Sequence, residues 1–168
     1  SSYMIKSVGA KYTLVGHSDN RSEGDTDSIL KDKVKFALKN NLKVVFCIGE
    51  NKSHKKNKKT FSVLKKQLTK VLEKKFNNNN IIVAYEPIWS IGTGKIPNQK
   101  DLLQTTKFIK KVLKNIFKKD SPAVLYGGSV DGNNVEMFKE IKEIDGFLIG
   151  GASKSSKKFI DIIKNYYR

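Results

Sequence analysis

The sequence predicts a single α/β domain built on five parallel strands. Short runs rich in Val, Ile, Leu and Tyr alternate with longer stretches of helical period along all 168 residues. These short runs lack the apolar/polar alternation of a half-exposed strand, which is typical of parallel strands covered on both faces. No linker or break in composition interrupts the pattern, so we expect one domain over residues 1–168.

Five strands are predicted where the apolar runs fall: Tyr12–Gly16, Lys43–Gly49, Ile81–Tyr85, Ala123–Tyr126 and Gly146–Ile149. The amphipathic stretches between and after them predict five helices: Thr26–Asn40, Thr60–Phe76, Asn98–Lys118, Asn134–Ile141 and Lys157–Tyr166. Asn98 is expected to cap its helix, with Asp101 in the first turn to favour the helix dipole. The lysine-rich segment "KSHKKNKK" is expected to be an exposed loop.

The strongly basic composition raises the question of a nucleic-acid partner. The sequence contains 33 Lys and Arg residues and 16 Asp and Glu residues, which gives a formal net charge of +17. Only Arg21 and Arg168 are arginines, whereas specific nucleic-acid readers depend on arginine for bidentate contacts. The lysines are spread over nearly every amphipathic segment, which favours solvated helix faces over a nucleic-acid surface.

Targeting and redox features agree with a cytoplasmic protein. No apolar run approaches the length of a membrane span, and the N-terminus lacks the features of a signal peptide. The single cysteine, Cys47, has no partner for an internal disulfide, which suits a reducing compartment. Because the chain begins at Ser1 rather than methionine, we expect it to be cut from something longer.

Polar or glycine-rich motifs follow all five predicted strands. They read "GHS", "CIGE", "YEP", "YGGS" and "IGGAS". The carboxyl ends of parallel strands meet at one edge of the sheet, where α/β enzymes place their sites. Any one motif could be only a tight turn, but five at one edge predict a functional site.

Glu86 ends the third predicted strand and precedes a glycine-containing loop. A carboxylate at a strand end is either paired, here with one of many lysines, or engaged in proton chemistry. Pro87 fixes the backbone after it, Trp89 offers a large apolar body, and "SIGTGK" supplies glycines that can approach a ligand and move. This arrangement is what a mobile lid beside a general base requires.

His17 follows the first predicted strand, where a helical turn is expected to begin. A lone histidine is usually satisfied by local hydrogen bonds, and that alternative stays open. A helix N-terminus, however, favours neutral imidazole over imidazolium. A neutral imidazole can donate a hydrogen bond to a developing oxyanion.

Two glycine pairs, in "YGGSV" and "GGAS", predict a phosphate site. Backbone amides at such turns can form a cradle for phosphate. Neither pair matches the spacing of an ATP or dinucleotide site, so neither ligand is expected. Consecutive turns near the end of the chain match the usual phosphate site of (β/α)8 barrels. The chain has no Cys/His cluster or dense group of carboxylates at the strand ends, so no metal is expected.

Taken with their order and spacing, these motifs resemble those of the triosephosphate isomerase family over the whole chain. "AYEPIWSIGTGK" is similar to the family's base-and-lid motif, with Ser90 where alanine is common. "VGHS", "CIGE", "YGGSV" and "DGFLIGGAS" resemble its other strand-end motifs. The resemblance implies a partial TIM (β/α)8 barrel, in which the five strands are the fourth to eighth. Residues 1–168 would then form a single incomplete barrel domain.

The resemblance also implies an activity and a set of site residues. The family interconverts dihydroxyacetone phosphate and glyceraldehyde 3-phosphate through an enediolate in glycolysis and gluconeogenesis. Glu86 would be the base, and His17 the neutral electrophile. The phosphate would be held by Gly92, Ser129, Gly150 and Gly151, and the site would be supported by Ser18 and Glu50. The lid would comprise Pro87, Ile88, Trp89, Ser90, Ile91, Gly92, Thr93, Gly94 and Lys95. The resemblance implies no cofactor or metal. It implies that the full-length protein is a homodimer in the cytoplasm.

Departures from the family pattern carry their own expectations. Asp19-Asn20 stands where the family has Glu-Arg, and Pro97 where alanine is usual. The family's N-terminal third, with three strands, an asparagine and a catalytic lysine, would be missing from these 168 residues. Five strands cannot close a barrel, so we expect this chain alone to be unstable and to show little activity.

Two other functions remain open for these motifs. A non-catalytic phosphate- or nucleic-acid-binding module is the first. Another phosphosugar isomerase or an aldolase on the same fold is the second. The aldolase is disfavoured because no Schiff-base lysine stands at a strand end.

Overall fold

The computed structural model describes residues 1–168 and contains one five-stranded parallel sheet whose strands follow chain order. The strands are β1 (Tyr12–Val15), β2 (Lys43–Ile48), β3 (Ile81–Tyr85), β4 (Val124–Tyr126) and β5 (Gly146–Phe147). Each strand pairs in parallel with the next, and β1 and β5 are the open edges. The α/β fold class is therefore confirmed, with five parallel strands arranged as in part of a (β/α)8 barrel.

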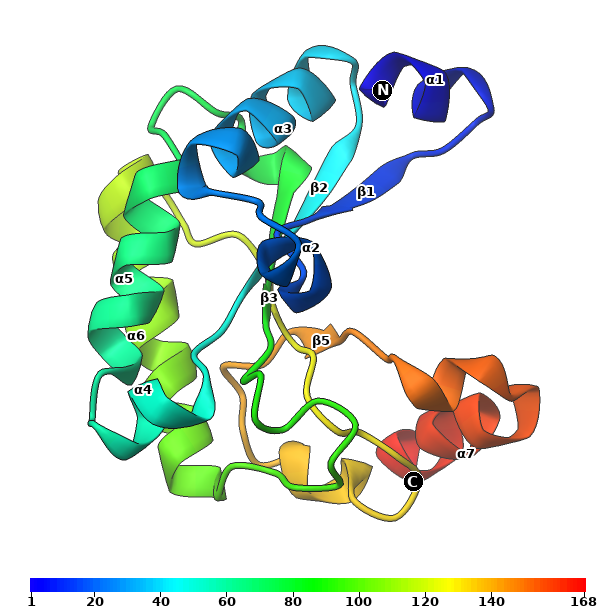
Figure 1. Cartoon of the computed structure of the whole chain (residues 1–168). Coiled ribbons are helices and arrows are strands. Elements are labelled where there is room, and N and C mark those ends of the chain that lie inside the picture. Colours follow the sequence, from blue (N-terminus) through cyan, green and yellow to red (C-terminus); the bar gives the residue numbers. More distant parts are fainter.

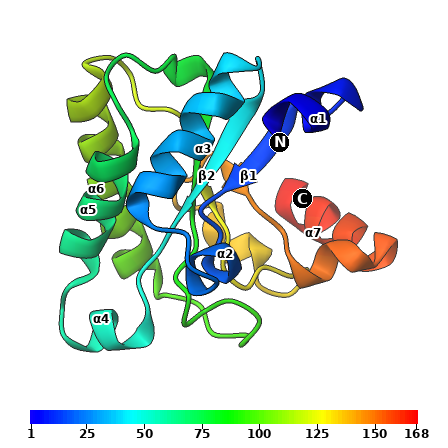
Figure 2. The ribbon, with the colours of Figure 1, turned by 45° about the horizontal axis from the view of Figure 1, so that its top comes forward.

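Helices follow the strands and cover one face of the sheet. The α-helices are α1 (Ser2–Ser7), α2 (Ser18–Ser22), α3 (Asp27–Lys39), α4 (Lys52–Lys56), α5 (Thr60–Val71), α6 (Gln99–Phe117) and α7 (Ser156–Tyr167). Three short 3-10 helices complete the chain: η1 (Asn78–Asn80), η2 (Val135–Phe138) and η3 (Gly151–Lys154). Helices α3, α5 and α6 lie side by side, whereas α7 stands apart beyond β5 (Figures 1 and 2). None of the helices has the length and apolarity that a membrane crossing requires.

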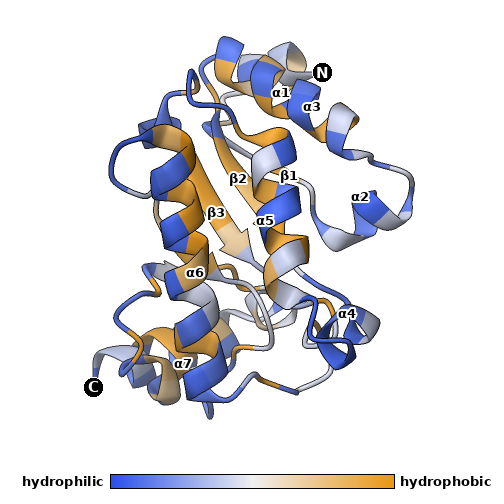
Figure 3. Cartoon of the chain, turned by 90° about the vertical axis from the view of Figure 1, so that its left-hand side faces the viewer, coloured by the Kyte–Doolittle hydropathy of each residue, from blue (hydrophilic) through white to orange (hydrophobic).

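The long helix α6 shows why these segments fold as they do. The Asn98 side chain accepts a hydrogen bond of 2.8 Å from the Asp101 N–H, which confirms the predicted cap. Leu102, Ile109 and Leu113 lie on one face and are fully buried. Each contributes about 1.5–3 kcal/mol through removal of its apolar surface from water. Figure 3 shows the apolar faces of α5 and α6 turned toward the strands.

Both faces of β2, an interior strand of the sheet, are apolar. Phe46 and Ile48 belong to the main core of 28 buried residues, between the sheet and the helices. Val45 and Cys47 point to the opposite face, where they form a small separate cluster with Ala84. This two-sided burial is the physical reason that the strand sequences do not alternate.

Several predicted elements differ in length or kind. Helix α5 ends at Val71 rather than Phe76, because Leu72 adopts an extended conformation and is buried. The helix predicted over 134–141 is only the 3-10 helix η2, and β5 ends at Phe147 rather than Ile149.

Two further short helices were not predicted. The expected lysine-rich loop is wrong in part: Lys52–Lys56 forms α4, because the Asn51 side chain accepts a hydrogen bond of 2.8 Å from the His54 N–H and caps it. Helix α1 was also not anticipated.

Candidate active site

Residues that follow the five strands gather at one edge of the sheet. His17 follows β1, Glu50 follows β2, and Glu86 follows β3. Ser129 and Gly150 lie in the turns after β4 and β5. Parallel strands place their carboxyl ends together, so local strand order alone brings these residues to a common edge.

Glu86 and His17 face each other across this edge. The Oε1 atom of Glu86 lies 3.8 Å from Nε2 of His17. Glu86 is 4% exposed, and its backbone N–H donates to the Ile48 carbonyl, which extends the β2–β3 pairing by one step. A Cβ at Gly127 would come 2.6 Å from Cγ of Glu86, so the carboxylate fits here only because Gly127 has no side chain.

The surroundings of Glu86 favour the protonated form of its carboxyl group by raising its pKa. Burial raises the pKa of Glu86 above its usual value, and the nearby His17 and the Cys47 thiol partly offset this effect. Burial also raises the pKa of Cys47, which keeps its thiol protonated beside the carboxylate. Cys47 is a contact of Glu86 that sequence reasoning missed; its place in strand β2, one strand from Glu86, was the only available signal.

His17 is the N-cap of α2, so the expected helical turn after it is present. Its Nδ1 accepts a hydrogen bond of 3.3 Å from the Asp19 N–H. A nitrogen that accepts carries no proton, so in the neutral imidazole the proton is on Nε2, the atom that faces Glu86. The Asp19 carboxylate lies 3.4 Å from Nδ1, with its side chain largely exposed.

Glu50 fastens the start of the predicted lid, Pro87–Lys95, to the sheet. It is 1% exposed and accepts hydrogen bonds from the Trp89 indole at 2.8 Å and from the Tyr85 hydroxyl at 3.1 Å. The Lys55 ammonium lies 3.7 Å from the centre of the Trp89 ring, a cation–π contact. The buried Glu50 carboxyl group is thereby hydrogen-bonded, and the Trp89 side chain is held by Glu50 at its indole N–H and by Lys55 at its ring face.

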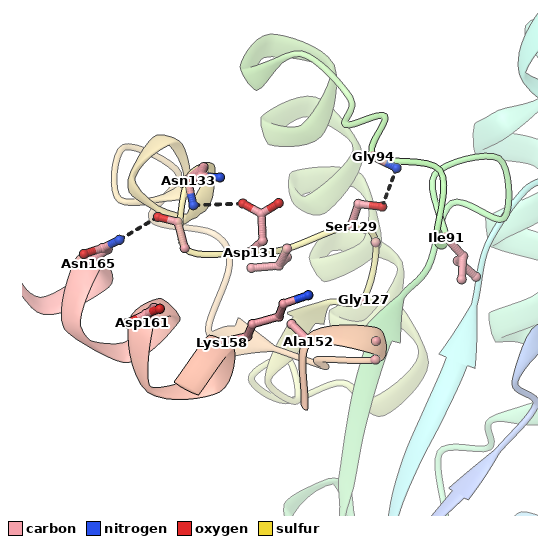
Figure 4. A pocket seen from close by; sticks show the side chains of 16 residues that line it. Ile91, Gly94, Gly127, Ser129, Asp131, Asn133, Ala152, Lys158, Asp161 and Asn165 are labelled. Carbon is pink, nitrogen blue, oxygen red and sulfur yellow. Dashed lines mark hydrogen bonds between the residues drawn. The ribbon is translucent and has the colours of Figure 1, made fainter. Parts of the chain in front are cut away.

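A cavity of about 540 Å³ lies between the lid and the turns after β4 and β5 (Figure 4). It brings together four of the predicted residues, Gly92, Ser129, Gly150 and Gly151. The Gly127 residue that contacts Glu86 also lines this cavity, so the two parts of the site adjoin.

The cavity offers backbone donors and one cationic side chain. The N–H groups of Gly92, Gly128, Gly150 and Gly151 have no acceptor within the protein. A buried or cavity-lining amide needs a partner, so such amides favour an anion. Lys158, the only cationic side chain that lines the cavity, extends into it from the first turn of α7 (Figure 4). Sequence reasoning missed Lys158 because it is one lysine among many.

Ser18 and Arg21 lie behind the Glu86 carboxylate. Both line a small cavity that Glu86 also borders. Arg21 donates hydrogen bonds to the carbonyls of Gly16 at 2.8 Å and Cys47 at 3.1 Å, and its burial lowers its pKa. Arg21 therefore joins the ends of β1 and β2. Its rarity, as one of two arginines, was the signal that could have identified it.

The fold and this edge define the class of protein. A parallel sheet in chain order, with helices after its strands and a polar site at the strand carboxyl ends, is an α/β protein of the (β/α)8-barrel class. No group of three or more His, Cys, Asp or Glu side chains is arranged to hold a metal ion. The site instead combines a buried carboxylate, an imidazole and unpaired amides.

Comparison with known proteins gives the family. The family model described as triosephosphate isomerase matches residues 1–166, and the chain belongs to this family. A triosephosphate isomerase of Saccharomyces cerevisiae is 42% identical over 165 residues, and one of Yarrowia lipolytica is 41% identical over 164. Each match covers 96% of this chain and 66% of the relative, so the chain spans just under two thirds of these relatives' length.

Proposed function

We propose that the protein carrying this chain interconverts dihydroxyacetone phosphate and glyceraldehyde 3-phosphate through an enediolate, in glycolysis and gluconeogenesis. Family membership supports the reaction, and one observation carries the assignment of residues. The buried Glu86 carboxylate lies 3.8 Å from His17 Nε2, beside a cavity lined by unpaired amides. The proposed proton-transfer pair thus adjoins the proposed anion site, an arrangement that supports this isomerisation of a phosphorylated substrate.

Glu86 is the proposed base. It removes a proton from the carbon next to the substrate carbonyl and returns it to the neighbouring carbon. A base works best when its pKa lies near the operating pH. Burial shifts the pKa of Glu86 in that direction, upward from the usual carboxyl value.

His17 is the proposed electrophile. Its Nε2–H donates to the substrate carbonyl oxygen and then carries protons between the enediolate oxygens. The hydrogen bond from the Asp19 N–H to Nδ1 supports the tautomer that this role needs. Ser18 is proposed to support Glu86 and His17, since it lines the small cavity that Glu86 borders.

The phosphate group is proposed to occupy the cavity between the lid and the glycine turns. Gly92, Gly150 and Gly151 would donate backbone N–H groups to it, together with the Ser129 turn. A Cβ at Gly92, Gly150 or Gly151 would meet no atom within 4 Å, so space is available for a ligand at each. Closure of the lid would exclude water and keep the enediolate from expelling phosphate. Glu50 would hold the lid through Trp89.

Other properties of the intact protein follow from the same proposal. The substrate carbonyl is itself the electron sink, so no cofactor or metal is required. We expect a homodimer in the cytoplasm, with no nucleic-acid or membrane partner. The asparagine and lysine that family members carry in their N-terminal third are expected to complete the site.

Isomerisation and proton exchange test this proposal together. The intact protein is incubated with dihydroxyacetone phosphate in D₂O, and the product is examined for deuterium on the carbon that received the proton. We expect glyceraldehyde 3-phosphate carrying solvent deuterium, and loss of both signals in Glu86→Gln. Glu140→Gln, an exposed carboxylate away from the site, is the control. Absence of isomerisation in the unmodified protein would refute the assignment.

A further inference from the structure

Ser90 is a fully buried hydroxyl in a lid whose C-terminal part is exposed. Its exposure is 0%, whereas Gly92, Thr93, Gly94 and Lys95 all face solvent. A buried hydroxyl is costly unless it is hydrogen-bonded. Its hydrogen-bond partners therefore show what it does in the lid.

One oxygen of Ser90 joins three segments of the chain. Ser90 Oγ donates to the Lys95 carbonyl at 2.5 Å, lies 3.1 Å from the Tyr126 hydroxyl, and accepts from the Ser129 N–H at 3.4 Å. A hydroxyl has one donor and two acceptor positions, and these contacts use all three. Since its proton is given to Lys95, Tyr126 is the donor in their shared hydrogen bond.

Tyr126 is well suited to this contact. Burial raises its pKa to about 12, so its hydroxyl stays protonated across the neutral range. The ring is 1% exposed, and Ser90 is the only hydrogen-bond partner of its hydroxyl. A Cβ at Gly128 would overlap this hydroxyl and come 2.7 Å from Ser90 Oγ. The junction therefore needs glycine at that position.

Ser129 makes the reciprocal contact. Its hydroxyl donates to the Ser90 carbonyl at 2.6 Å and accepts from the Gly94 N–H at 3.2 Å. Two serines, one in the lid and one in the turn after β4, thus cross-link the lid to the wall of the cavity. These contacts can exist only while the lid lies against the turn.

We propose that Ser90 is a positioning residue that fastens the lid in its closed conformation through Tyr126 and the Ser129 N–H, while its hydrogen bond to Lys95 fixes the shape of the lid itself. The inference rests on the proposed function and adds the group that holds the lid of that same site. Alanine, which is common at this position in the family, has no hydroxyl and cannot make these contacts. Pro97, at the C-terminal end of the same loop, has no N–H to offer in their place.

Binding of inorganic phosphate to the intact protein tests the proposal without requiring activity. Trp89 lies in the lid and is the one tryptophan among residues 1–168, so the fluorescence change that Trp89→Phe abolishes reports lid closure. We expect Ser90→Ala to raise the Kd for phosphate roughly three- to tenfold, because closure loses one buried hydrogen-bond junction. Ser62→Ala, an exposed hydroxyl on α5, is the matched control and should leave the Kd unchanged.

A double-mutant cycle with Tyr126→Phe separates the shared contact from a general loss of stability. Each single substitution leaves a partner unsatisfied, whereas the double substitution removes both groups. The double variant should therefore bind phosphate about as well as either single variant. The proposal would be overturned if the double variant raised the Kd by the product of the two single-variant factors. An unchanged Kd in Ser90→Ala would also overturn it.

Relaxation of the lid amides distinguishes this inference from the proposed function. In the unliganded protein, the N–H groups of Gly92 and Gly94 should show faster or larger exchange in Ser90→Ala than in the parent. If the parent binds no phosphate, the proposed function fails, but these relaxation rates still test the role of Ser90. Identical rates in parent and variant would exclude it.

Discussion

Glu86 Oε1 lies 3.8 Å from His17 Nε2, although the two residues follow strands β3 and β1, which are separated by β2. The contact spans the strand between them because both side chains project from the same edge of the sheet. Gly49, just after β2, lets the Glu86 backbone lie close to that strand, since a Cβ there would overlap the Glu86 carbonyl oxygen.

Shortening Glu86 by one methylene should remove most of the activity. In Glu86→Asp the carboxylate is withdrawn from the position of the substrate proton, so turnover should fall by about 100-fold or more. The KM should change little, since the phosphate-binding residues are untouched. Steady-state kinetics of the intact protein measure both values, with Glu140→Asp as the exposed control. An unchanged turnover number would remove Glu86 from its proposed role.

Neutralising the same side chain should stabilise the fold at neutral pH. Burial raises the pKa of Glu86 in the folded state, so its ionisation costs folding free energy. Stability linked to the protonated carboxyl is complete below the unfolded-state pKa, about 4.3, and is lost as the pH rises through the folded-state pKa. Glu86→Gln should therefore exceed the parent in free energy of unfolding at pH 7, and the difference should shrink toward pH 4. Urea titrations across this range measure it; a variant less stable than the parent at pH 7 would contradict the prediction.

Gly49 should not tolerate a side chain. A Cβ there would overlap the backbone carbonyl of Glu86, and neither backbone can move without breaking the β2–β3 pairing. We expect Gly49→Ala to cost about 3 kcal/mol of unfolding free energy. Gly151→Ala, where a Cβ meets nothing within 4 Å, should stay within about 0.5 kcal/mol on the same denaturant curves. Equal stability of the two variants would show that the close approach is unimportant.

Pro97 should slow the motion of the lid. Its ring fixes φ at the C-terminal end of the loop, and the residue is buried. A hinge with one backbone angle fixed has fewer ways to absorb the change on opening. Pro97→Ala should therefore give faster lid exchange in relaxation measurements on Gly92 and Gly94. Rates indistinguishable between the two proteins would refute the idea.

The 168-residue chain made by itself should aggregate or unfold easily. Strands β1 and β5 each pair on one side only, and Leu14 on β1 is 50% exposed. Phe36 on α3 and Ile160 on α7 are also about half exposed, near the two open edges. Unpaired edges with apolar neighbours favour association. Light scattering and thermal melting test this, and a soluble monomer with a cooperative transition would contradict it.

The order and nature of the main elements could be predicted from the residue pattern alone. Non-alternating apolar runs predicted all five strands, because both faces of a parallel sheet are buried, and the Asn98 cap was predicted because capping is a local interaction. The residue pattern also brought His17, Glu86 and the glycine turns to one edge, since parallel strands share their carboxyl ends. The extents of α5, η2 and β5 were not predictable in this way. For α5, the burial of Leu72 in an extended conformation decides where the helix stops.

Only the tertiary structure decided which side chains meet. The approach of Glu86 to His17, the burial of Cys47 beneath it, and the junction of Ser90 with Tyr126 join residues far apart in the chain. Such contacts depend on the spacing and twist of neighbouring strands and on glycines that allow close approach at Gly127 and Gly128. A motif identifies the residue types of a site, whereas the distances between them arise only when the strands pack side by side.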